Sequence, residues 1–142
     1  MNIALHNRKG VVSTAVASIL VAVMLLLSGC SVVNDLKDIS SAGNAFVAAI
    51  GTGNAADAAA LMHPRAQASG DLAAALKANF IDRKFGGVTI SGTKVENGVG
   101  ELTGKCNLAD GSGNIQAGDL TMQLEKDGDK WKVLNISCKI SQ

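Results

Sequence analysis

Three cysteines carry most of the chemistry that this chain could perform: Cys30, Cys106 and Cys138. A thiol can be acylated, oxidised to a disulfide or bound to a metal ion, and its surroundings decide among these outcomes. Cys30 closes a long apolar segment near the N-terminus, whereas the other two lie among alternating apolar positions of the second half. We therefore expect one chemistry at Cys30 and another at the remaining pair.

The residues before Cys30 are Leu27-Ser28-Gly29, at the end of an apolar run preceded by Arg8 and Lys9. This pattern resembles the lipobox of bacterial lipoprotein signal peptides. The resemblance implies cleavage between Gly29 and Cys30, removal of residues 1–29, and diacylation of Cys30. It also implies a location at the cell membrane or outer membrane, with the domain facing the periplasm or exterior. In the enteric sorting pattern, Ser31 after the cysteine favours the outer membrane.

Two alternatives remain open for the apolar segment. Residues 11–27 carry no charge, and a membrane-spanning helix needs about 20 apolar residues, with about 17 as the lower limit, so an uncleaved signal anchor is one alternative. A pilin-like leader, cut after Gly10, would instead retain residues 11–29 as an assembly helix. Bacterial pilins usually carry glutamate at the fifth mature position, where this chain has Ala15.

The composition of the mature chain excludes some partners. Removing Arg8 and Lys9 from the thirteen basic residues leaves a formal side-chain charge of −1 against the twelve acidic residues. This balance gives no electrostatic reason to bind nucleic acid. Residues 30–142 suffice for one ordinary domain, so we expect a lipidated cysteine and short tether over 30–35 and a single domain over 36–142.

The period of the apolar residues changes midway along the chain. A spacing of three and four predicts helices over about 36–50, 55–62 and 71–83. Alternation with turn signals then predicts strands over 88–95, 99–108, 117–126 and 130–140. The parity of the apolar positions switches near Val133-Leu134, which predicts a bulge. The expected fold class is α+β, with helices on one face of a curved, mainly antiparallel four-stranded sheet.

A family resemblance rests on the order of several short segments. They are Phe46-Val47-Ala48-Ala49-Ile50, Gly53-Asn54, Leu61-Met62-His63-Pro64, Leu124-Glu125-Lys126-Asp127-Gly128 and Lys130-Trp131-Lys132-Val133. Over roughly residues 40–140 the chain resembles the nuclear-transport-factor-2-like (NTF2-like) superfamily, and within it small bacterial lipoproteins whose domain has no assigned function. The resemblance implies a cone-shaped fold that encloses a pocket. Members include isomerases and dehydratases as well as non-catalytic modules, so the fold alone does not choose a function.

Once Cys30 is acylated, Cys106 and Cys138 remain as an even number of thiols in an exported protein. We expect them at the same end of the sheet, either bonded to each other or as two buried free thiols. In a strict meander they would lie about 9–10 Å apart, too far for a disulfide. A bond therefore requires the third strand to start late, near Leu120, or the sheet to curl.

No residue pattern predicts catalysis, a metal site or a cofactor. His63 is the single histidine of the mature chain, and beside Pro64 we expect it to help end the second helix. An isomerase site of this family would need an oxyanion donor such as tyrosine, and the chain has none. Phe46, Phe80, Met122 and Trp131 are the candidates to line a ligand pocket in the cone, although Trp131 suits the core as well.

We therefore expect a membrane-anchored, non-catalytic binding or interaction module of the cell envelope. Its partners would be the membrane, through the lipid on Cys30, and a second copy or another envelope protein. The sequence identifies no small ligand. The alternatives are a small isomerase or hydrolase that uses the cone pocket, and the pilin-like structural subunit.

Overall fold

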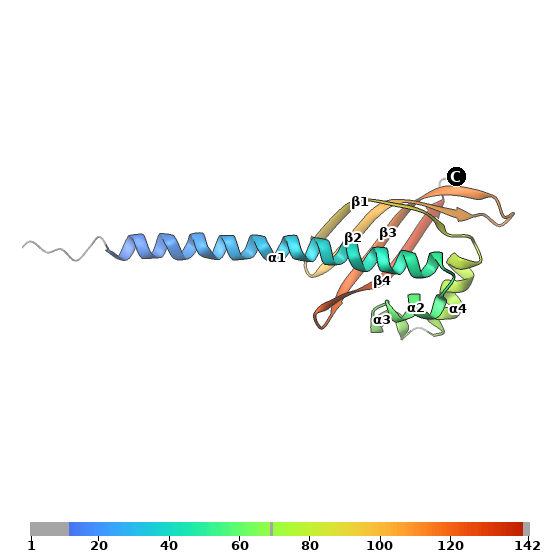
Figure 1. Cartoon of the computed structure of the whole chain (residues 1–142), viewed down its shortest axis with the longest axis horizontal. Coiled ribbons are helices and arrows are strands. Elements are labelled where there is room, and N and C mark those ends of the chain that lie inside the picture. The colour runs from blue at the N-terminus through green and yellow to red at the C-terminus, as the bar shows by residue number, and fades with distance from the viewer. Residues whose placement is uncertain (1–11, 69, 141–142) are drawn as a thin grey trace, which may run out of the picture. The chain divides into compact units, whose positions relative to one another are not determined.

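The computed structural model of the chain describes residues 12–68 and 70–140, with side chains from Ser31 onward (Figure 1). The chain divides into two units, residues 1–34 and 35–142. The predicted cleavage between Gly29 and Cys30 and the predicted lipid on Cys30 fall on residues whose side chains the structure does not describe. The same holds for Arg8 and Lys9. The second unit holds the sheet and the short helices, and its architecture positions the site.

The first helix, α1, covers Val12–Gly51. Its expected start near Leu36 is replaced by a start at Val12, because the apolar run is rich in helix-forming Ala, Leu and Met and contains no proline. The helix ends where Gly53 adopts a φ of +77°, which glycine tolerates. Within the part of the chain that the structure describes, no helix is long and apolar enough to cross a membrane.

Four short helical segments follow α1: α2 (Ala55–Ala60), α3 (Pro64–Gln67), α4 (Leu72–Leu76) and the π-helix η1 (Lys77–Ile81). The side chain of Asn54 accepts from Asp57 N and thereby caps α2, while Asp71 caps α4 by accepting from Ala74 N. The sequence did not predict α3, because Pro64 was expected only to end a helix. Proline also fits the first helical position, where its missing N–H is not needed.

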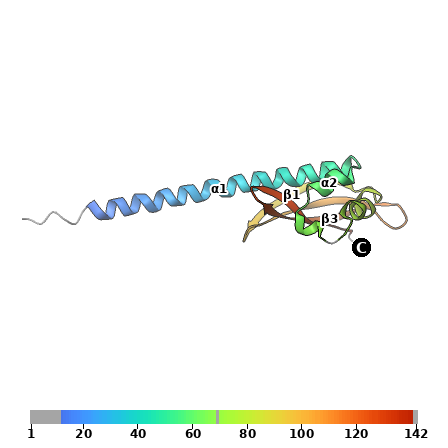
Figure 2. The same ribbon diagram turned by 90° about the horizontal axis from the view of Figure 1, so that it is seen from below.

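The second half of the chain forms one antiparallel sheet in the order β1-β2-β3-β4. Its strands are β1 (Gly86–Glu96), β2 (Val99–Ala109), β3 (Ile115–Asp127) and β4 (Lys130–Ile140). The part of α1 that belongs to the second unit lies along one face of this sheet (Figure 2). The predicted α+β class and the four-stranded antiparallel meander are confirmed.

A bulge in β4 sits where the change of parity predicted it. Leu124 pairs with Val133, whereas Gln123 pairs with Asn135, so Leu134 is the additional residue. The bulge lets Trp131 and Val133 face the core before it and shifts the register by one residue beyond it. Cys138 therefore lies opposite Leu120.

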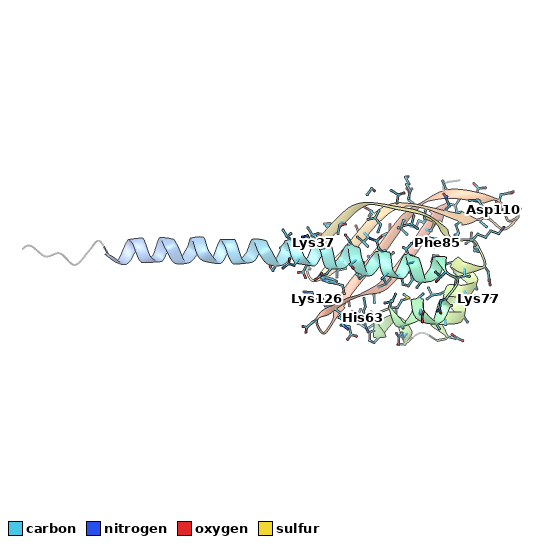
Figure 3. The ribbon with its side chains drawn as sticks, in the orientation of Figure 1. Lys37, His63, Lys77, Phe85, Asp110 and Lys126 are labelled. Atoms are coloured by element: carbon cyan, nitrogen blue, oxygen red, sulfur yellow. A yellow bond between two sulfur atoms is a disulfide. The ribbon has the colours of Figure 1, made fainter. Side chains whose placement is uncertain are left out.

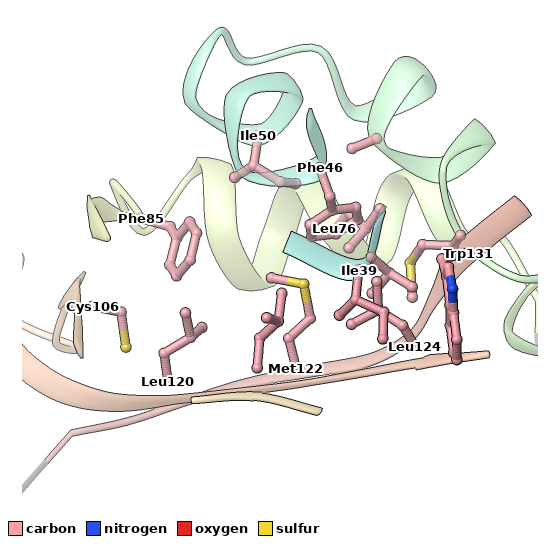
Figure 4. Close-up of a cluster of buried hydrophobic side chains, with 14 of the residues drawn as sticks. Ile39, Phe46, Ile50, Leu76, Phe85, Cys106, Leu120, Met122, Leu124 and Trp131 are labelled. Carbon is pink, nitrogen blue, oxygen red and sulfur yellow. The ribbon is translucent and has the colours of Figure 1, made fainter. Parts of the chain in front are cut away.

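The core lies between α1 and the concave face of the sheet (Figure 4). Two glycines allow the helix to approach the strands closely. A Cβ on Gly43 of α1 would overlap Leu102 Cδ1, and a Cβ on Gly100 of β2 would lie 2.6 Å from Ile39 Cδ1. The largest fully buried side chains fill the interior of the cone: Ile39, Phe46, Leu102, Leu120, Met122, Leu124 and Val133.

Candidate binding hollow beside the disulfide

Cys106 of β2 and Cys138 of β4 form a disulfide, with their Cα atoms 6.2 Å apart. The predicted pairing is thus confirmed. The bond crosses an intervening strand, because Cys106 pairs with Gly118 of β3, and Gly118 pairs in turn with Ile140 of β4. Two strand spacings of a flat sheet would separate β2 from β4 by about 9–10 Å, so the sheet must curl here.

Gly118 makes that curl possible. A Cβ at this position would lie 2.6 Å from the carbonyl oxygen of Lys139 in the backbone of β4. Of the two routes to a disulfide that the sequence left open, curling of the sheet is observed. The other, a late start of the third strand near Leu120, is wrong, because β3 begins at Ile115 and is paired with β2 from Ile115 to Glu125.

A hollow of about 300 Å³ opens beside this disulfide. Three elements meet around it: the segment that contains η1, the end of β2 and the second half of β4. Its lining residues are Asn79, Phe80, Arg83, Leu108, Ile136, Ser137 and Cys138. The hollow therefore lies at the mouth of the cone, while the interior behind it is filled by the core.

The π-helix supplies one wall of the hollow. Its wider turns are closed by bonds from Asp82 N to Lys77 O and from Phe85 N to Phe80 O. The Phe80 ring meets the Phe85 ring edge-to-face, with centroids 5.3 Å apart. This contact fixes Phe80 between the core and the hollow.

Arg83 is fastened to the last residue of β2 by two hydrogen bonds. Its Nε donates to Ala109 O over 2.9 Å, and Ala109 N donates to Arg83 O over 2.7 Å. The paired bonds hold the guanidinium group at the rim. Among the described residues, no carboxylate forms an ion pair with Arg83, so its positive charge is available to an anionic group in the hollow.

The predicted pocket residues lie in different places. Phe80 lines the hollow, whereas Phe46 and Met122 are fully buried in the core. Trp131 is buried and contributes to a separate groove of about 390 Å³, together with Ala42 and Leu61. The structure thus brings only Phe80 of the four to the hollow. Arg83 was missed, although a cation just before the Gly86-Gly87 break was a signal for it.

His63 has a structural position. The ring Nδ1 of His63 accepts a hydrogen bond from Arg65 N over 3.1 Å, which caps α3. The backbone N–H of His63 donates to Val133 O. Figure 3 shows His63 far from Asp110, which lies at the end of the domain that contains the hollow. Within the described chain, no group of three His, Cys, Asp or Glu side chains is placed to hold a metal ion.

The chemistry of the hollow suits binding. Its accessible lining is mainly polar and includes the Arg83 guanidinium, the Asn79 amide and the Ser137 hydroxyl, while Phe80, Leu108 and Ile136 supply a smaller apolar part. The lining contains no aspartate, glutamate or histidine that could serve as a general base. A small molecule with one carboxylate would match this arrangement, because the guanidinium can pair with the carboxylate while the amide and the hydroxyl offer further hydrogen bonds.

No family model matches the sequence, and no curated protein matches it. Among solved structures, the domain is similar to an NTF-2-like protein of unknown function from Shewanella oneidensis MR-1. The TM-score is 0.53 at 20% identity, over 70% of this chain and 94% of that chain. A second structure, an NTF2 variant designated Rd1NTF2_05, gives a TM-score of 0.45 at 15% identity, over 78% of this chain and 97% of that chain.

Proposed function

From the premise that this chain contains a domain with the NTF2-like fold, we propose that the protein is a lipid-anchored cell-envelope lipoprotein whose domain binds a small carboxylate. The hollow beside the disulfide is the observation that carries the binding role. It places one guanidinium, without a carboxylate partner among the described residues, beside the Asn79 amide, the Ser137 hydroxyl and the Phe80 ring. The domain binds its ligand without transforming it.

The lipid anchor rests on the sequence pattern around Cys30. Leu27-Ser28-Gly29-Cys30 follows an uncharged run behind two basic residues, as in lipoprotein signal peptides. The disulfide agrees with export, because such bonds persist in oxidising compartments. Acylation of Cys30 then accounts for all three cysteines.

The binding role is tested by titrating the 15N-labelled domain, residues 30–142 with Cys30→Ser, with short aliphatic and aromatic carboxylates. The matched primary amides of the same acids serve as comparison ligands. We expect shifts concentrated at the amides of Leu108, Ser137 and Cys138, and tighter binding of each acid than of its amide. The domain's own spectrum first confirms that it is folded.

Two variants sharpen this test. Arg83→Gln should reduce the preference for acid over amide by about tenfold or more, since a hydrogen bond to a charged group contributes about 1.5–3 kcal/mol. Lys84→Gln removes the neighbouring cation, which does not line the hollow, and should leave the preference intact. Shifts spread over the whole surface, or equal affinity for acids and amides, would contradict the proposed ligand class.

The catalytic alternative, a small isomerase or hydrolase, predicts chemical change of the bound molecule. Its polar groups would have to be Asn79, Arg83 and Ser137, which supply donors but no strong base. Recovery of the bound carboxylates unchanged after prolonged incubation supports the binding module. Turnover that Arg83→Gln abolishes would support the enzyme instead.

The pilin-like alternative has one specific observation in its favour, the continuity of α1 from Val12 to Gly51. A lipoprotein precursor with its signal peptide attached is also expected to be helical through the apolar run. The two proposals differ in the site of cleavage. The pilin-like subunit would begin at Val11 without an acyl group, and the lipoprotein would begin at an acylated Cys30.

A further inference from the structure

Polar contacts among Asp35, Lys126 and Trp131, called the clasp below, connect the start of the second unit to the β3–β4 hairpin. Asp35, the first residue of that unit, accepts a hydrogen bond from Trp131 Nε1 over 3.2 Å and forms an ion pair with Lys126 Nζ at 2.8 Å. The same ammonium group lies 5.3 Å from the centroid of the Trp131 ring. Hydrogen bonds from Lys126 and Trp131 hold the pKa of Asp35 below its usual value. The proposed hollow uses none of these residues.

The clasp lies at the end of the sheet that carries the β1–β2 and β3–β4 turns, called the two hairpin turns below, whereas the β2–β3 loop lies at the opposite end. Next along α1, Ile39 packs against Gly100, just after the β1–β2 turn, and Ser40 Oγ lies 3.3 Å from Thr93 Oγ1 of β1. Phe46 and Ile50, near the other end of α1, belong to the same core as Phe85 and Cys106 (Figure 4). Within the second unit, the helix therefore runs from the hairpin turns towards the disulfide.

We propose that the two hairpin turns form the membrane-facing end of the domain and that the hollow opens away from the bilayer. This inference rests on the lipid anchor of the proposed function. Five residues from Cys30 to Asp35 span at most about 18 Å when fully extended. Along the strands, Cys106 lies seven residues from the start of β2 and Cys138 eight residues from the start of β4, which corresponds to about 23–26 Å from the hairpin turns to the disulfide.

These two lengths prevent the domain from inverting on its anchor. A tether shorter than the strands cannot bring the disulfide end to the lipid headgroups while the hairpin turns point away. A ligand therefore reaches the hollow from the aqueous compartment, not from the lipid phase. A water-borne carboxylate fits this placement better than a membrane lipid does.

The charges of the hairpin end permit such a contact. Three ion pairs neutralise part of them locally, Lys94 with Glu96, Lys132 with Asp127, and Lys126 with Asp35, and the adjacent Asp129 and Lys130 carry opposite charges. An end of balanced charge meets little repulsion from an anionic headgroup layer. No attraction to anionic lipid is needed, because the acyl chains hold the domain at the surface.

The test uses the mature, acylated protein in vesicles with nitroxide-labelled headgroups. Asp129→Cys places a fluorophore in the β3–β4 turn, and Ser112→Cys places one in the loop between β2 and β3. With Cys30 acylated and the other cysteines bonded, the introduced thiol is the one that reacts. We expect several-fold stronger quenching of the label at position 129 than of the label at position 112.

A longer tether is the matched control. Inserting about ten Gly and Ser residues between Asn34 and Asp35 adds a flexible linker, which should remove most of the difference while the protein still floats with the vesicles. Equal quenching of the two labels in floating protein, or stronger quenching at position 112, would overturn the orientation and leave the anchor intact. Failure of the unaltered protein to float would overturn the anchor, and this inference with it.

Discussion

At the scale of single residues, Gly118 explains how the disulfide forms across an intervening strand. The position has no Cβ, so the carbonyl oxygen of Lys139 can approach its backbone. Nothing in the sequence marks this glycine, because alternation along the strand does not report how sharply a sheet curls. The pairing of Cys106 with Cys138 was predictable from the count of thiols, whereas its geometry depended on Gly118.

Gly118→Ala should destabilise the domain by about 1–3 kcal/mol, the usual cost of forcing an added methyl group into a packed site. It should also slow formation of the disulfide, since β2 and β4 would be held further apart. Urea denaturation and thiol counting measure the two effects. Gly111→Ala is the control, because nothing lies within 4 Å of a Cβ there. Equal effects of the two substitutions would contradict this role of Gly118.

Asp35 gives a prediction about pH. Its pKa is lowered in the folded state from the ordinary 3.8, first by the hydrogen bond from Lys126 and then by that from Trp131. The ionised carboxylate therefore stabilises the fold above that ordinary value, and this contribution is lost as the pH falls through the lowered pKa. Asp35→Asn should lower Tm at neutral pH, and its difference from the unaltered protein should shrink in acid.

Asp38→Asn serves as the comparison, because Asp38 forms no ion pair within the described chain. Its Tm should follow that of the unaltered protein at every pH. A difference for Asp35→Asn that stays constant down to acid pH would show that the clasp does not depend on the charge of Asp35.

At the scale of elements, local patterns predicted the sheet better than the helices. The strands lie within two residues of their expected bounds, since each alternating run is closed by a turn signal such as Glu96-Asn97-Gly98. The π-helix was not predictable, because its i to i+5 bonds depend on packing between Phe80 and Phe85 and not on local propensity. That packing also determines the position of Arg83. The sequence therefore could not predict that Arg83 lines the hollow.

At the same scale, the disulfide should stabilise the domain by restricting the unfolded chain. It closes a loop with a sequence separation of 32 residues, which corresponds to about 3–4 kcal/mol in the chain-entropy model. The double variant Cys106→Ser and Cys138→Ser should lose about that much free energy of unfolding. Hydrogen exchange should accelerate at residues 104–108 and 136–140, where the curl relaxes, and remain slow around Leu124 and Val133. Uniform acceleration would contradict a local role for the bond.

At the scale of the whole molecule, the chain combines a domain of NTF2-like fold with an apolar N-terminal segment that we propose to be a lipoprotein signal peptide. The similar protein from Shewanella oneidensis MR-1 has unknown function, so the fold defines the architecture and the hollow supplies the chemistry. The lipid on Cys30 would decide where that chemistry is presented. The anchor is therefore the claim on which the proposed location and the proposed orientation both depend.

Intact mass spectrometry of the detergent-extracted protein, with and without reductant, tests the anchor most directly. We predict a chain that begins at Cys30, carries the added mass of acyl chains, and gains two hydrogens when the Cys106–Cys138 bond is reduced. A mass that corresponds to the full unmodified chain, or to a chain that begins at Val11 without acyl groups, would contradict the lipoprotein.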